Sequence, residues 1–104
     1  MINYIKTENA FNKILKKGVK DSENINILFT SSYDKTSQAI LREITSGNHK
    51  LSDKLHVVDS FETPHAFVAY NTSQVPCLVN ITNKKKNIEY HVPFIYEKLG
   101  VSVP

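Results

Sequence analysis

The chain has 104 residues, 40% of them hydrophobic, and a formal net charge of +3 at pH 7. The length and the hydrophobic fraction predict one domain over residues 1–104 with its own core. No apolar run is long enough to cross a membrane, and the first residues mix Asn, Lys and Glu, so we expect a cytoplasmic protein without a membrane span or secretory signal. The lone cysteine, Cys77, excludes an internal disulfide and a cysteine-rich zinc site, and the four histidines are too dispersed for a local metal motif.

The first half of the chain predicts two strands, each followed by a helix. Residues 2–5 are a short apolar stretch typical of an edge strand. Thr7 is placed to cap a helix that runs to about residue 17, where Gly18 closes it. The aliphatic run 25–30 predicts a buried strand, and residues 34–46 predict a second helix. The helix residues expected to face the core are Phe11, Ile14, Leu15, Ile40, Leu41 and Ile44.

The second half predicts another strand and helix, then a hairpin and a final helix. The elements expected here are a strand over residues 55–59, a short helix from Thr63-Pro64, strands over residues 77–82 and 87–91, and a helix over residues 94–99. Pro64 and Pro93 open their helices, because proline at the first helical position loses no hydrogen bond. Gly100 ends the last helix, and residues 83–86 form the hairpin turn.

The predicted order of elements is β-α-β-α-β-α-β-β-α. Strands that alternate with helices pair in parallel through right-handed crossovers, whereas the final hairpin adds an antiparallel part. The sequence therefore predicts an α/β fold with a central, mixed five-stranded sheet flanked by helices.

The segment LHVVDSFETPHAFVAYNTSQVPCLV, together with this order and length, resembles the thioredoxin/glutaredoxin family over essentially the whole chain. In that family a strand ending in Asp precedes a short helix, and Val-Pro then leads into the next strand. The resemblance implies a thioredoxin-like fold, a cis Val75-Pro76 bond and a main chain at Val75 that pairs with an extended partner segment. Frequent Lys, Asn and Ile further suggest a phage or low-GC bacterial source.

The Cys-x-x-Cys motif of the family is missing from this chain. In one alignment Asp34 and Ser37 take the two cysteine positions, and in another Ser31 and Asp34 do, so neither alignment recovers a thiol. Leu28 stands where thioredoxins place a buried carboxylate that handles protons for the inner cysteine. The resemblance therefore implies a thioredoxin-like protein without dithiol exchange.

Three residues near this segment each allow two interpretations. Asp34 could supply a functional carboxylate, but an N-cap of the following helix is favoured. Cys77 could be an activated thiol near the second helix, but strand alternation favours a core thiol that faces the same layer as Val79. Tyr33 could belong to a contact surface or pack over the proline loop, and the sequence does not decide between these two.

The remaining polar residues carry weaker signals. His56 lies among aliphatic residues and is expected to be a satisfied, partly buried side chain, whereas His65 and His91 are expected to be exposed. Lys84 to Lys86 could contact phosphate or acidic partners, but a solubilising turn is favoured. Twelve of the thirteen basic residues are lysines, so the chain lacks the arginine forks that read bases, and nucleic-acid binding is not favoured.

The preferred hypothesis is a redox-inactive, thioredoxin-like protein-binding or accessory module, without a cofactor, whose partner is a protein of unknown identity. The residues expected to form its binding site are Tyr33, Asp34, Ser37, Val75 and Pro76. The alternative is an enzyme, a monothiol thiol–disulfide oxidoreductase in which Cys77 forms mixed disulfides, with glutathione as a candidate co-substrate and Lys35 as the nearest positive charge.

Overall fold

The computed structural model describes residues 2–21, 25–46, 55–60, 63–69, 74–82 and 85–100. The elements in these ranges follow the predicted order of strands and helices. They are β1 (Ile2–Ile5), α1 (Glu8–Asp21), β2 (Ile25–Thr30), α2 (Lys35–Ser46), β3 (Leu55–Asp59), α3 (Pro64–Ala69), β4 (Cys77–Thr82), β5 (Lys85–Glu89) and α4 (Val92–Leu99). None of the helices in the described ranges has the length and hydrophobicity to cross a membrane.

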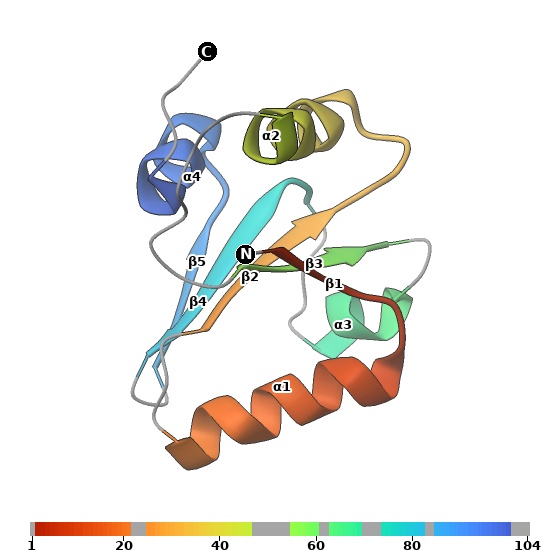
Figure 1. Cartoon of the computed structure of the whole chain (residues 1–104), viewed down its shortest axis with the longest axis vertical. Coiled ribbons are helices and arrows are strands. Elements are labelled where there is room, and N and C mark those ends of the chain that lie inside the picture. Colours follow the sequence, from red (N-terminus) through yellow and green to blue (C-terminus); the bar gives the residue numbers. More distant parts are fainter. Residues whose placement is uncertain are drawn as a thin grey trace.

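The strands form one sheet in the order β1-β3-β2-β4-β5. β1, β3 and β2 are parallel, whereas β4 is antiparallel to both of its neighbours, β2 and β5. Figure 1 shows α1 and α3 on one face of this sheet and α2 and α4 on the other. The predicted α/β fold, with a mixed five-stranded sheet between helices, is therefore confirmed.

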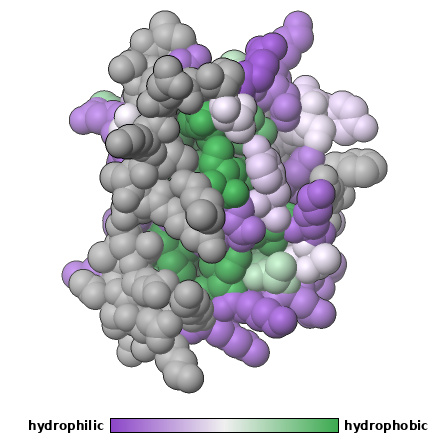
Figure 2. Space-filling view, in the orientation of Figure 1, coloured by the Kyte–Doolittle hydropathy of each residue, from purple (hydrophilic) through white to green (hydrophobic). Residues whose placement is uncertain are grey.

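Adjacent residues of β2 enter two separate cores, because side chains alternate across a strand. Phe29 lies in the core beneath α1 and α3, where its ring meets Phe11 and Phe67 edge to face at centroid distances of 6.4 and 4.9 Å. Leu28 lies in the opposite core, which α2 and α4 cover. The helix residues predicted to face inward all contribute: Phe11, Ile40 and Ile44 are buried, and Ile14, Leu15 and Leu41 are partly buried. Figure 2 shows hydrophobic side chains reaching the surface between the two helical layers.

Thr7 and Gly100 mark helix ends as predicted, whereas Gly18 does not, and α4 begins at Val92, one residue before Pro93. Thr7 caps α1, since its Oγ1 accepts a hydrogen bond from the Ala10 amide at 3.1 Å. Gly100 ends α4 in the left-handed conformation, with a φ of 75°. The prediction that Gly18 closes the first helix is wrong, because α1 continues through it to Asp21. A glycine inside a helix costs only about 1 kcal/mol, which tertiary packing of an amphipathic helix offsets.

The hairpin differs from the prediction by a shift of β5 toward the N-terminus. β5 spans Lys85–Glu89 instead of residues 87–91, and Thr82 already pairs with Lys85. The expected lysine turn is therefore wrong for Lys85 and Lys86, which are exposed residues of the strand, while Lys84 lies outside the described residues. Lysines suit this position because β5 forms an edge of the sheet, where charge discourages pairing with another chain.

Candidate functional site

A tight turn, Ser31 to Asp34, stands where the resemblance places the dithiol motif. The Ser31 carbonyl accepts hydrogen bonds from the Asp34 amide at 3.1 Å and from Nε2 of Gln38 at 2.9 Å. The Ser31 hydroxyl oxygen accepts a third bond from the Tyr33 amide at 3.2 Å. The turn is therefore held by its own backbone and by a side chain of α2.

Asp34 is the N-cap of α2, which confirms the favoured interpretation. Its Oδ2 accepts hydrogen bonds from both the amide and the hydroxyl of Ser37, each at 2.7 Å. Ser37 is fully buried, so its hydroxyl cannot reach a ligand in solution. In the alignment that gives Asp34 and Ser37 the two cysteine positions, these residues lie together, but they stabilise the start of the helix and offer no accessible nucleophile.

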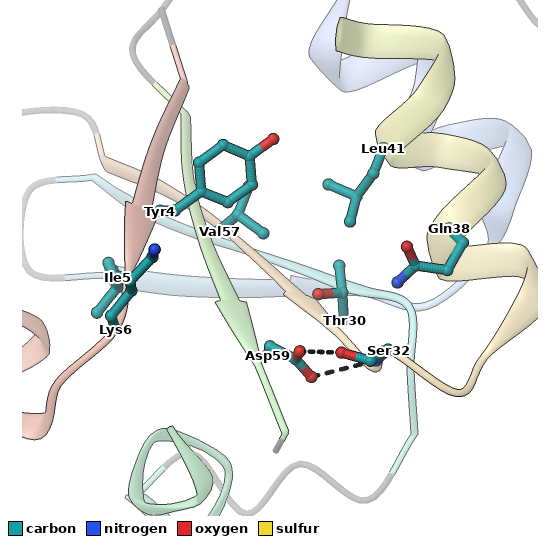
Figure 3. A pocket seen from close by; sticks show the side chains of 9 residues that line it. All are labelled: Tyr4, Ile5, Lys6, Thr30, Ser32, Gln38, Leu41, Val57 and Asp59. Carbon is teal, nitrogen blue, oxygen red and sulfur yellow. Dashed lines mark hydrogen bonds between the residues drawn. The ribbon is translucent and has the colours of Figure 1, made fainter. Parts of the chain in front are cut away.

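Asp59 fixes the same turn from the end of β3, and the sequence analysis missed this role. Its carboxylate accepts a hydrogen bond from the Ser32 amide at 3.2 Å and another from the Ser32 hydroxyl (Figure 3). The sequence positions could have revealed this contact, because Ser32 follows β2 and Asp59 ends β3. β2 and β3 are parallel neighbours, so their carboxyl ends lie side by side. The turn is consequently anchored at both of its ends.

The segment before β4 lies at the same end of the sheet. The Val75-Pro76 peptide bond is cis, as the resemblance implies, with Pro76 buried and Val75 half-buried. The pairing of Phe29 with Cys77 sets the start of β4 beside the end of β2. The residues predicted to form the binding site therefore come from two segments that both lie at this end of the sheet.

Cys77 is buried in the core beneath α1 and α3, with an exposed fraction of 0%. Burial raises the pKa of its thiol from 9.0 to about 11; a hydrogen bond with Tyr90 lowers this pKa and the negative charge of Glu89 raises it. The thiol is consequently protonated near neutral pH. Its position agrees with the favoured interpretation, since Cys77 and Val79 share one core and Leu78 lies in the other.

Exposed aromatic side chains surround this end of the sheet. Tyr33, at the tip of the Ser31–Asp34 turn, is 84% exposed, which favours a contact surface over packing on the proline loop. Tyr90 and Phe94, which lie between the end of β5 and the first turn of α4, are 41% and 50% exposed. The ring of His91 contacts Phe94 at a centroid distance of 4.9 Å. Large exposed aromatic side chains are typical of surfaces that bind other proteins.

The histidines offer no metal site within the described ranges. His56 is buried and its Nδ1 lies 3.0 Å from Nδ2 of Asn3, so it is a satisfied core residue, as predicted. His65 and His91 are exposed, also as predicted, and His65 lies 3.6 Å from the Glu8 carboxylate. Among the residues that the structure describes, no three His, Cys, Asp or Glu side chains cluster as metal ligands would.

The sequence matches no family model and no curated protein. Solved structures of thioredoxins, in contrast, resemble the whole fold. Oxidised thioredoxin O2 of Arabidopsis thaliana is 23% identical with a TM-score of 0.73, over 95% of this chain and 94% of the other. Thioredoxin O1 of the same plant is 18% identical with a TM-score of 0.75, over 95% and 97%. Thioredoxin of Fasciola hepatica is 14% identical with a TM-score of 0.74, over 93% and 95%. The fold is therefore thioredoxin-like, while the single cysteine leaves no dithiol motif.

Proposed function

We propose that this chain is a protein-binding module that uses the end of a thioredoxin-like sheet to hold an extended segment of a protein partner. The observation that carries the proposal is the anchored turn Ser31 to Asp34. It replaces a reactive motif with an N-cap, and it presents Tyr33 with 84% of its surface exposed. A rigid turn lowers the entropy lost on binding, so the aromatic ring becomes an efficient anchor.

The partner segment forms main-chain hydrogen bonds at Val75, the same kind of bond by which extended peptides pair with exposed strand backbone. Pro76 is buried behind this position, and Tyr33 supplies apolar contact. Asp34 and Ser37 act indirectly, because they fix the start of α2 and thereby the direction of the turn. The Lys-, Asn- and Ile-rich composition supports a phage or low-GC bacterial source, with the module working in the cytoplasm.

The alternative enzyme, a monothiol oxidoreductase that uses glutathione, requires an accessible thiol of lowered pKa. Cys77 has the opposite properties, since its exposed fraction is 0% and its pKa is raised to about 11. A buried thiol with a raised pKa does not fit the chemistry that this activity needs.

Selection from a library of linear peptides, followed by affinity measurement on three variants, tests the proposal. We expect Tyr33→Ala to weaken binding by about tenfold or more, since loss of a buried aromatic anchor costs over 1 kcal/mol. Tyr33→Phe keeps the ring and should retain most of the affinity, and Cys77→Ser should leave affinity nearly unchanged. Hydrogen exchange should show protection of the Val75 amide in the complex.

The proposal is wrong if selected peptides bind Tyr33→Ala as tightly as the parent chain while the Val75 amide stays unprotected. Loss of binding in Cys77→Ser alone, with mixed disulfides formed by the parent chain, would support the enzyme instead.

A further inference from the structure

The outer side of β5 is an open edge of the sheet. β5 stands last in the strand order, and β4 is its only neighbour among the described strands. Figure 1 shows this strand at the left border of the sheet. Residues 85–88 are exposed and Glu89 is half-buried. Alternate residues of an edge strand direct their N–H and C=O groups outward, so β5 offers main-chain hydrogen bonds to another strand.

The charges of β5 are complementary to those of a second β5 that runs antiparallel to it. If a two-fold axis passes through Asn87, Lys85 of each copy lies opposite Glu89 of the other. Within the described ranges Lys85 forms no salt bridge, and the Glu89 carboxylate accepts one hydrogen bond, from the neutral amide of His91 at 3.2 Å. Opposite charges that face each other across a strand pair stabilise it, so this arrangement gains two favourable pairs.

The neighbouring registers of the same strand pair fit less well. An axis at Lys86 sets the two Lys86 side chains opposite each other, and like charges in that position are unfavourable. An axis at Ile88 sets Glu89 opposite Asn87, so Lys85 no longer faces a carboxylate. The charges that discourage pairing of this edge with most chains therefore select one partner strand and one register.

A row of asparagines crosses the sheet toward the proposed axis. Nδ2 of Asn80 donates to Oδ1 of Asn26 at 2.7 Å, and Asn87 lies opposite Asn80 in the register of β4 and β5. An amide side chain has both a donor and an acceptor, so two Asn87 side chains that face each other across a two-fold axis can exchange two hydrogen bonds. The row of amides then continues from one sheet into the other.

Ile88 adds an apolar contribution on the other face of the sheet. It lies opposite Val79, a residue of the core beneath α1 and α3, yet 36% of its own surface is exposed. In a pair centred on Asn87, Ile88 lies opposite Lys86 of the second copy, and the methylene stem of a lysine can cover apolar surface. Pairing thus buries apolar surface that the single chain leaves in contact with water.

We propose that β5 pairs with β5 of a second copy of this chain, antiparallel about a two-fold axis at Asn87, and so joins the two sheets into one. A pair of such short strands buries less than the roughly 1,600 Å² of a standard interface, so we expect a weak dimer with a dissociation constant on the order of 0.1 mM.

The interface lies apart from the other features of the molecule. It contains none of Tyr33, Val75 and Pro76, so each copy keeps its own proposed binding site. It is also apart from the pocket of about 170 Å³ that Figure 3 shows beside the Ser31–Asp34 turn, between β1 and α2, because β1 and β5 are opposite edges of the sheet.

Sedimentation equilibrium of the full chain at constant ionic strength tests the proposal, over about 10 µM to about 1 mM to bracket the expected dissociation constant. Lys85→Glu or Glu89→Lys alone sets like charges opposite each other and should weaken the dimer by about tenfold or more. The two changes together exchange the charges within each pair and should restore the parent affinity to within about threefold. Lys98→Glu makes the same change of net charge at an exposed residue of α4 and should have no effect.

A cysteine at the proposed axis provides a second measurement. Residues directly opposite each other in an antiparallel pair have Cα atoms about 4.5–5.5 Å apart, which a disulfide can bridge. Oxidation of Asn87→Cys should therefore give a covalent dimer at concentrations where Lys98→Cys stays mostly monomeric. The native Cys77 is buried and does not compete.

A chain that remains monomeric at about 1 mM, without cross-linking of Asn87→Cys, would overturn the proposal. A dimer that Lys85→Glu and Glu89→Lys leave unchanged would do so as well, because it would use another surface. Protection of the β5 amides by an acidic peptide, in a chain that does not dimerise, would assign this edge to a different protein. Tyr33→Ala should leave the dimer intact, so failure of this proposal and failure of the proposed function are distinguishable.

Discussion

The chemistry of Cys77 is set by its surroundings more than by its identity. The side chain lies at the start of β4, pairs with Phe29 of β2 and belongs to the core that α1 and α3 cover. A thiolate there would lose its hydration, so the protonated form is favoured and the pKa rises to about 11. An exposed thiol would keep its hydration when ionised and would react more readily.

Alkylation of the native protein at pH 8 should be at least about 100-fold slower than alkylation of the denatured chain. Two pKa units, from 9.0 to about 11, reduce the thiolate fraction by about that factor, and burial slows the reagent further. Iodoacetamide labelling with and without guanidinium, followed by mass spectrometry, gives both rates. Native labelling as fast as denatured labelling, with a midpoint below pH 8.5, would mean an activated thiolate.

Asp34 and Asp59 show which contacts of the site a sequence can reveal. The cap between Asp34 and Ser37 spans three residues, so helix-capping rules predict it from local spacing. The bonds between Asp59 and Ser32 span 27 residues and exist only because β2 and β3 are parallel neighbours. The turn from Ser31 to Asp34 could therefore be placed from the sequence, but its contact with Asp59 and the pocket beside it could not.

At the scale of elements, the strands and helices were predictable, but the end of α1, the bounds of β5 and the start of α4, at Val92 instead of residue 94, were not. The apolar runs of β2 and β3 and the amphipathic pattern of α2 each indicate one type of structure, and the structure agrees with all three. Gly18 predicted the end of the first helix, yet α1 continues through it to Asp21. The hairpin lysines predicted a turn, yet Lys85 and Lys86 pair with residues of β4 and belong to β5. Weak local preferences of about 1 kcal/mol yield to such contacts.

Replacement of Gly100 by alanine should destabilise the protein by about 1 kcal/mol, because Gly100 ends α4 in the left-handed conformation. Gly100 has a φ of 75°, which costs a residue with a Cβ atom roughly 1–2 kcal/mol. A Cβ atom would meet nothing within 4 Å, so the cost is one of backbone conformation without a clash. Thermal unfolding should show a Tm lower by about 4–8 °C. Gly100→Asn is the matched control and should lose less, because Asn tolerates this conformation better; equal Tm values for all three chains would contradict the explanation.

At the scale of the whole molecule, the order of elements was the most predictable property. It follows from two sequence periods, 3.6 residues in helices and two residues in strands. Strands alternate at every second residue, which divides Leu28 from Phe29 and builds a core on each face of the sheet. The pocket and the group of exposed aromatic residues (Tyr33, Tyr90 and Phe94) depend on how the helices and the sheet pack against one another. No local sequence pattern encodes this packing, so the sequence alone does not predict either feature.

Alkaline pH should destabilise the whole fold, and Cys77 should account for part of the loss. Its folded pKa, about 11, exceeds the ordinary value of 9.0, so its contribution to stability is complete below pH 9 and disappears as pH rises to 11. Two pKa units correspond to at most about 2.7 kcal/mol. The pKa values of Tyr90 and Tyr96 are also raised, chiefly by burial, and they add a loss of the same sign.

Urea unfolding of the parent chain and of Cys77→Ala, at intervals from pH 7 to pH 11, measures the loss that depends on the thiol. Both proteins should lose stability at high pH through the tyrosines. The parent chain should lose more between pH 9 and pH 11, because it carries the buried thiol and because Cys77 also raises the pKa of Tyr90. The comparison uses the change with pH, so the constant cost of the smaller alanine side chain cancels. Parallel curves over this interval would mean that the Cys77 thiol ionises as readily in the folded state as in the unfolded chain, and the case for an inert, buried cysteine would fail.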